Sequence, residues 1–193
     1  MQLWTVQPLS ALRDLEETGV FRCDRDKSFN LTKADSLEKP YQWLIAQMKE
    51  RIGLPPAGVC YPIWAWHTWE FQRRMPDPDS AAFLRRTEDK VLLTLDIPDH
   101  QVTLTDFDAW QLVLQGGYVA DARTAEEFDA LEEWLENLPA EELTAAVHDS
   151  WQHVFLVDRI DNALMTRGKY IQATFWEIRK EYVRANRLLP PTV

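Results

Sequence analysis

Residues 59–71 read VCYPIWAWHTWEF and hold three of the nine tryptophans of the chain. If this stretch is a strand, alternation places Trp64 and Trp66 on one face and Ile63 and Ala65 on the other. Each indole N–H needs an acceptor when it is buried. Two interpretations stay open: an aromatic strand of the core, or a flat apolar wall that grips a planar ligand.

Polar side chains among these rings give the stretch its candidate chemistry. His67 lies beside two tryptophans and Glu70 follows three residues later, so we expect this pair to supply acid–base catalysis or polar contacts if the stretch lines a pocket. The indoles would stack a planar group, and the arginines that follow would meet phosphates. The expected ligand contacts of the stretch are Trp64, Trp66, Trp69, Arg73 and Arg74.

Composition favours a single compact domain over residues 1–193. A chain of this size buries enough surface to fold without a disulfide or a metal. No basic leader and no membrane-length apolar run are present, so we expect a soluble cytoplasmic protein that does not contact a membrane. Cys23 and Cys60 lack ligand spacing and are expected to be free thiols. The oligomeric state stays open.

The net charge of −10 disfavours nucleic acid as a partner, because nonspecific binding to phosphates needs cations. The acidic residues concentrate at positions 121–149, where Arg123 is the one Lys or Arg. This segment supports an alternative function: a non-enzymatic interaction module that binds a protein partner through its acidic helices.

Hydrophobic periodicity predicts the order of the elements. Short strands are expected at 3–6, 20–23, 91–97 and 102–104. Helices are expected from Ser10 to the stop at Gly19, at 37–52, 81–86, 107–114 and 143–155, and over 124–138 with Thr124 and Glu127 as a capping box. Either Thr105 or Asp106 is expected to cap the helix that begins at Phe107. A last helix is expected over 171–183, from the spacing of Ile171, Phe175, Ile178 and Tyr182.

This order predicts an α+β fold. A small mixed sheet is expected from the first half of the chain, residues 1–105. A helical layer is expected from the second half, residues 106–193.

Phosphate-cradling and hydrolase motifs are missing from the chain. There is no Walker loop, GxGxxG, HExxH or GxSxG pattern. His148 and His153 are five residues apart and do not share a helix face, so no metal site is expected.

Four segments resemble a bacterial family of uncharacterised proteins of about this length. They are LWTVQ (3–7), YPIWAW (61–66), TDFDAW (105–110) and IQATFW (171–176). The resemblance covers most of the chain and implies a bacterial cytoplasmic protein without a known activity.

The opening of the chain is similar to that of ADP-ribosyltransferase-like domains, which include enzymes acting on DNA bases and RNA 2′-phosphotransferases. The shared pattern is a first strand, a helix of the form Leu-x-x-Leu-x-x-x-Gly, and then Val20-Phe21-Arg22. The resemblance implies NAD bound in the cleft of a split sheet. The residues that would take the family roles are Gln7 or Thr5 on the first strand, Tyr61 on a middle strand, and Glu70 or Glu177 as the late glutamate.

Two features depart from that pattern. The first strand lacks the usual arginine or histidine, and Glu177 falls in the helix predicted over 171–183. The sequence leaves open whether the protein is an enzyme. Its leading interpretation is an aromatic-lined site for a small ligand, a nucleotide or NAD.

Overall fold

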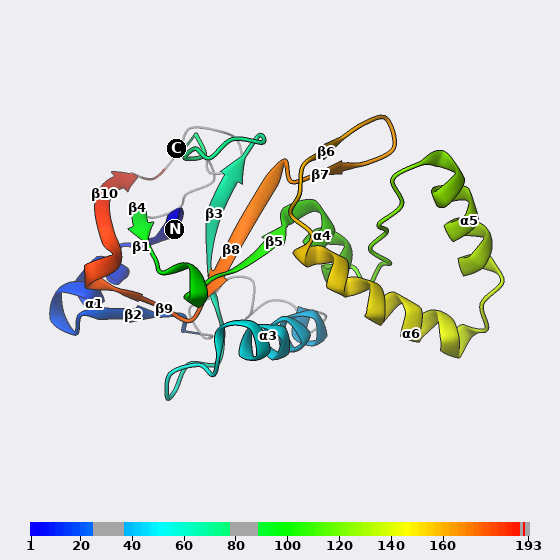
Figure 1. The fold of residues 1–193 in the computed structure, drawn as a ribbon. Helices are drawn as coiled ribbons and strands as arrows, with labels where there is room; N and C mark the ends of the chain where they lie inside the picture. Colours follow the sequence, from blue (N-terminus) through cyan, green and yellow to red (C-terminus); the bar gives the residue numbers. More distant parts are fainter. Residues whose placement is uncertain (25–36, 78–88, 190, 192–193) are drawn as a thin grey trace.

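The computed structural model describes residues 1–24, 37–77, 89–189 and 191 (Figure 1). Its helices are α1 (Ser10–Glu17), α3 (Glu38–Ile52), α4 (Phe107–Leu114), α5 (Ala125–Glu136) and α6 (Ala140–Ser150). Its longer strands are β1 (Gln2–Pro8), β3 (Ile63–Trp69), β4 (Lys90–Asp96), β5 (Thr103–Asp106), β8 (Tyr170–Phe175) and β10 (Val183–Leu189). The short strands are β2 (Val20–Arg22), β6 (Ile160–Asp161), β7 (Thr166–Arg167) and β9 (Glu177–Arg179). Single 3-10 turns occupy Asp99–Gln101, Trp151–Phe155 and Lys180–Tyr182.

The six longer strands form one antiparallel sheet in the order β10-β4-β1-β3-β8-β5. Two smaller antiparallel pairs, β2–β9 and β6–β7, complete the strands of the described residues. With helices at both ends of the sheet, the α+β class is confirmed. The predicted helix at 81–86 lies outside the described residues.

The last predicted helix is wrong, because residues 170–189 contain β8, β9 and β10, with a single 3-10 turn between β9 and β10. Ile171, Ala173 and Phe175 alternate on one face of β8 and are nearly inaccessible to solvent. The apolar residues of this segment fit both the spacing of a helix and the spacing of two that is typical of a strand. Pairing with β3 and β5 selects the strand. The sheet therefore draws on both halves of the chain and is antiparallel, where a mixed sheet from the first half was expected.

Alternation along β3 follows the prediction. Ile63 and Ala65 belong to the buried core cluster on one face of the sheet, together with Leu93. Trp64 points to the other face, against a second cluster that includes Tyr41 of α3 and Trp110 of α4. The two faces of one strand thus separate two hydrophobic clusters.

Strands β1 and β3 are neighbours in the sheet but share a single registered pair, Trp4 and Trp66. Nearer the start of β3, the side chain of Thr5 makes the link, since its hydroxyl donates to the carbonyl oxygen of Trp64 at 2.6 Å. Here a side-chain hydrogen bond takes the place of the backbone hydrogen bonds that would continue the pairing, so the two strands separate at this end.

Helices α5 and α6 extend away from the sheet, and α5 lies at the opposite end of the molecule from β10 (Figure 1). No side chain of α5 is buried. No helix in the described part of the chain is long and apolar enough to cross a membrane.

Candidate functional site

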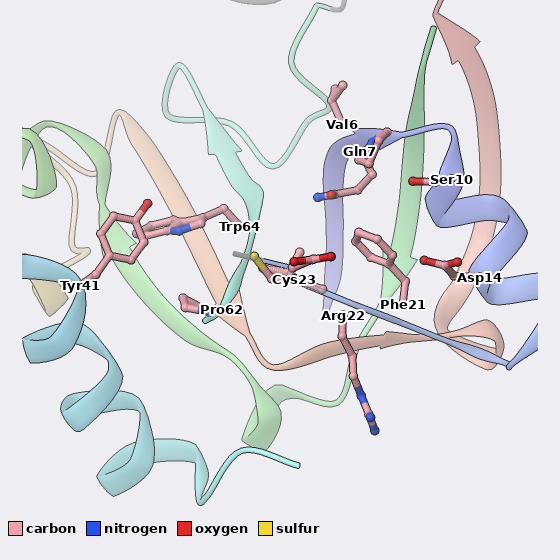
Figure 2. Close-up of a pocket in the computed structure, with 13 residues that line it drawn as sticks. Val6, Gln7, Ser10, Asp14, Phe21, Arg22, Cys23, Tyr41, Pro62 and Trp64 are labelled. Atoms are coloured by element: carbon pink, nitrogen blue, oxygen red, sulfur yellow. The ribbon is translucent and has the colours of Figure 1, made fainter. Parts of the chain in front are cut away.

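A cavity of about 300 Å³ opens where β1 and β3 separate (Figure 2). Its walls come from the end of β1, the first turns of α1, strand β2, the start of β3 and one side chain of α3. Its lining includes Gln7, Ser10, Asp14, Phe21, Cys23, Tyr41 and Trp64.

Gln7 is held in the wall by a short relay of hydrogen bonds. Its Nε2 donates to Thr5 Oγ1 at 2.7 Å, and that hydroxyl donates in turn to the Trp64 carbonyl. Thr5 is buried, so the relay is shielded from water. The Thr5 hydroxyl that links β1 to β3 therefore also fixes the carboxamide of Gln7 beside the cleft.

The Trp64 side chain lines the cleft, and its indole N–H is an unsatisfied donor buried within that wall. Its Nε1 is buried and has no hydrogen-bond partner among the described residues. Such a group costs about 1–3 kcal/mol unless an acceptor is supplied. An acceptor brought by a ligand or a water molecule would remove that cost once a shift of the indole or of the neighbouring Tyr41 ring exposes the N–H.

Tyr41 stands next to this indole, with ring centroids 6.3 Å apart and planes at 76°. Burial raises the pKa of the Tyr41 hydroxyl to about 12. The Trp64 indole opposes part of the rise, although its N–H does not reach the geometry of a hydrogen bond to the hydroxyl. Tyr41 thus stays neutral and keeps an O–H at the cleft over the physiological pH range.

The charged groups at the cleft favour cations over anions. Asp14 contributes a carboxylate to the wall. Arg22 lines the cleft but points away from its interior in Figure 2, and its Nε donates to Glu177 at 3.0 Å. Burial raises the pKa of the Cys23 thiol, so this sulfur stays protonated. Phosphate groups therefore find no uncommitted cation in the described lining.

Two of the residues predicted as ligand contacts, Gln7 and Trp64, line this cleft. Tyr61 does not, because its side chain is buried in the core and its hydroxyl bonds to Glu38. Trp66 and Trp69 contact each other at 4.9 Å between ring centroids, in a separate aromatic cluster. The other rings of that cluster are Phe107 and Tyr170.

The predicted acid–base pair lies at the opposite end of β3 from the cleft. Burial, reinforced by the charge of Arg73, lowers the pKa of His67 to about 4. Glu70 forms an ion pair with Arg74, and its backbone is in the left-handed region at a φ of 52°. Arg73 donates to the carbonyl oxygens of His67 and Gln2. Arg73 thus joins the end of β3 to β1, the Glu70–Arg74 pair lies within the turn, and none of the four side chains lines the cleft.

Glu177 lies on strand β9, which corrects its expected place in a helix. It pairs with Arg22 of β2, and its carboxylate accepts from Arg22 and from Arg179 at 2.8 Å. Directly opposed residues of an antiparallel pair share a face. Because Phe21 and Ile178 form the next pair and face the core, Glu177 faces away from the cleft.

Tyr41, Asp14 and Cys23 were missed as candidate lining residues. One sequence signal existed for Tyr41: it precedes Leu44 by three residues and Met48 by seven, so it belongs to the buried stripe of its helix. No comparable signal marks the other two, which reach the cleft from α1 and from the end of β2.

In the described ranges, no three His, Cys, Asp or Glu side chains gather in a way that could hold a metal ion. A family model described as a domain of unknown function, DUF3841, matches residues 2–184. No curated protein and no solved structure shows significant similarity to the chain.

Proposed function

The chain belongs to the DUF3841 family, and we propose that it binds a small planar ligand in the cleft between β1 and β3, with the nicotinamide part of NAD as the best fit. The buried, unpartnered Nε1 of Trp64 is the observation that carries this proposal. A carboxamide oxygen is the kind of acceptor that this donor lacks. Gln7, fixed by Thr5, brings a second carboxamide to the same cleft.

The size of the cleft limits how much of a dinucleotide it holds. A volume of about 300 Å³ is at the lower end of ligand pockets, which span roughly 300–1,000 Å³. The aromatic rings of Trp64 and Tyr41 suit a flat heterocycle. We therefore propose that the head group and its ribose enter the cleft, while the rest of the nucleotide stays outside.

Charge supports the oxidised form of the ligand. The nicotinamide ring of NAD⁺ is cationic, and the cleft offers it the Asp14 carboxylate and three aromatic side chains. The Arg22 guanidinium is already bound to Glu177, which disfavours recognition through phosphates. The dihydronicotinamide ring of NADH is uncharged, so NADH should bind more weakly than NAD⁺.

The resemblance to ADP-ribosyltransferase-like domains gains support from the position of the cleft. It lies where neighbouring strands separate, it has a polar residue at the end of the first strand, and Glu177 is on a late strand. Glu177 nevertheless faces away from the cleft and is bound by two arginines. The geometry thus favours ligand recognition over ADP-ribosyl transfer.

Calorimetric titration with NAD⁺, NADH and ATP tests the proposal on wild type and two matched variants. Trp64→Phe removes the unpartnered N–H and keeps a ring, and we expect about a tenfold loss of NAD⁺ affinity, equivalent to about 1.4 kcal/mol. Trp66→Phe changes the same face of the same strand outside the cleft and should leave affinity within about twofold. ATP lacks nicotinamide and should bind at least about tenfold more weakly than NAD⁺.

Three results would contradict the proposal. One is the absence of binding heat with NAD⁺ at millimolar concentration. Another is equal affinity for NAD⁺ and ATP, which would point to the adenine or the phosphates. The third is an equal loss of affinity in the two tryptophan variants.

A further inference from the structure

We propose that α5 and α6, residues 125–150 and here called the arm, form a docking surface for a basic amphipathic helix of a partner protein. This surface is separate from the cleft, and the inference does not depend on the function proposed above. It rests on three observations: an unburied apolar helix face, a hollow between the two helices, and a uniform negative charge.

The apolar face of α5 has the pattern of a helix that packs against something. Phe128, Leu131 and Leu135 recur at spacings of three and four residues, which place them on one side of the helix. None of these side chains is buried, and Phe128 is 37% exposed. Trp134 on the same helix is 47% exposed. Most helical stability in proteins comes from packing of such a face, so α5 has a face without a counterpart in the described structure.

A hollow of about 450 Å³ lies between the arm helices. Trp134 and Leu138 line it from the α5 side, and Ala145 and Ala146 line it from α6. Tyr118 also lines the hollow, with its ring centroid 6.5 Å from that of Trp134. Figure 1 shows α5 and α6 diverging from their connecting turn. Small alanines opposite a large indole leave room for the side chains of a third helix.

The negative charge of the arm indicates a partner of positive charge. Residues 125–150 contain nine carboxylates and no Lys or Arg, so the arm accounts for nine of the ten excess negative charges of the chain. Nearly all of these carboxylates are exposed, and none has a cation four residues away on its own helix. Their mutual repulsion would be relieved by a basic partner. The carboxylates are Glu126, Glu127, Asp129, Glu132, Glu133, Glu136, Glu141, Glu142 and Asp149.

The same charge argues against other occupants. A second copy of the chain would bring nine like charges to the interface, and nucleic acid or an anionic membrane would also be repelled. A helix fits the shape, since helix-in-groove recognition places apolar anchors between two helices and polar residues at the rim. Helix α5 is 12 residues long, roughly 18 Å, which matches a partner helix of about three turns.

A labelled peptide of lysine and leucine with helical spacing is the probe, used with the full chain in fluorescence anisotropy at low and moderate salt. A scrambled peptide of the same composition has the same charge but no apolar face. We expect the amphipathic peptide to bind at least about tenfold more tightly than the scrambled one, and more weakly as salt increases. Comparable binding of the two peptides would overturn the proposal, because it would show a nonspecific attraction of charge.

Two pairs of variants locate the site. Trp134→Ala should weaken peptide binding about tenfold, whereas Leu188→Ala, which alters a 60% exposed leucine on β10, should not change it. Reversing Glu132 and Glu133 to lysine should weaken binding, whereas reversing the exposed Glu16 and Glu17 of α1 should have little effect. All of these positions are exposed, so circular dichroism should show an unchanged fold.

Sedimentation of the free chain tests the remaining alternative, in which a second copy of the chain covers the arm. A monomer that binds the peptide supports the proposal. A dimer that Trp134→Ala dissociates would show that a second copy covers the arm, and it would overturn the assignment to a basic partner. Equal effects of Trp134→Ala and Leu188→Ala on peptide binding would also overturn the proposal.

Discussion

At the residue scale, His67 lies in partly buried surroundings that favour its neutral form. It occupies a bulge in β3, because the register with β8 shifts between Trp66 and Thr68. Its Nδ1 lies 2.9 Å from Thr68 Oγ1, and the Arg73 guanidinium binds its carbonyl oxygen. Burial and this cation lower its pKa to about 4, so His67 is neutral at physiological pH.

A depressed pKa makes the stability of the protein depend on pH with a definite sign. The unfolded state binds the His67 proton more strongly, so this stabilising contribution is complete above about pH 6.5 and is lost as the pH falls toward about 4. Because the ring is only partly buried, we expect about 1 kcal/mol of the stability lost between pH 7 and pH 5 to come from His67. Urea unfolding of wild type and His67→Gln at both pH values measures it. An equal loss in the two proteins would contradict the assignment.

At the element scale, two helix caps of similar chemistry have very different surroundings. Asp106 is 2% exposed. Its Oδ1 accepts from the Ala109 backbone N–H at 3.0 Å, and its Oδ2 accepts from that of Gly168 at 2.7 Å. One carboxylate thus starts α4 and holds the turn that leads into β8, so Asp106 is the cap of the two, Thr105 or Asp106, that the sequence left open. Thr124 accepts from Glu127 at 3.2 Å and is exposed at the start of α5.

This difference predicts unequal costs of removing the two caps. Asp106→Ala leaves two backbone donors without a partner in a buried site and should cost about 2–4 kcal/mol of unfolding free energy. Thr124→Ala should cost about 1 kcal/mol or less, because water can replace the lost oxygen. Chemical denaturation of the two variants gives both values. Equal losses would show that burial of the Asp106 carboxylate does not matter to the fold.

At the scale of the whole molecule, the sheet and the arm differ in how firmly they are packed. Val91 and Leu93 of β4 have no exposed surface, and β4 pairs with strands on both sides. Helix α5 buries no side chain. Local opening of α5 should therefore require far less free energy than opening of the central sheet, which unfolds only with the whole domain.

Hydrogen exchange followed by mass spectrometry tests this contrast. We expect α5 amides to exchange with opening free energies at least about 3 kcal/mol below those of β4. A basic peptide that docks on the arm should slow exchange in α5 and α6 without changing β4. Protection of α5 equal to that of β4 in the free chain would contradict the packing described above.

Local patterns in the sequence determined the class of the fold and many of its elements. The helix over 37–52 and the strand over 91–97 follow apolar spacing, and the cap at Thr124 follows side-chain chemistry. Alternation along β3 also placed Trp64 on the face opposite Ile63. These features depend on residues within a few positions of one another, which is why a single sequence reveals them.

Tertiary structure alone decided the strands at 170–189 and the membership of the cleft. The spacing of residues 171–182 permits a helix or strands, and pairing with β3, about 100 positions earlier, selects strands. Gln7, Tyr41 and Trp64 come from three elements and meet because β1 and β3 separate after one registered pair. A periodic pattern reports which face of an element is apolar, but it carries no information about the distant segment that covers that face, because pairing depends on the fit of the whole chain.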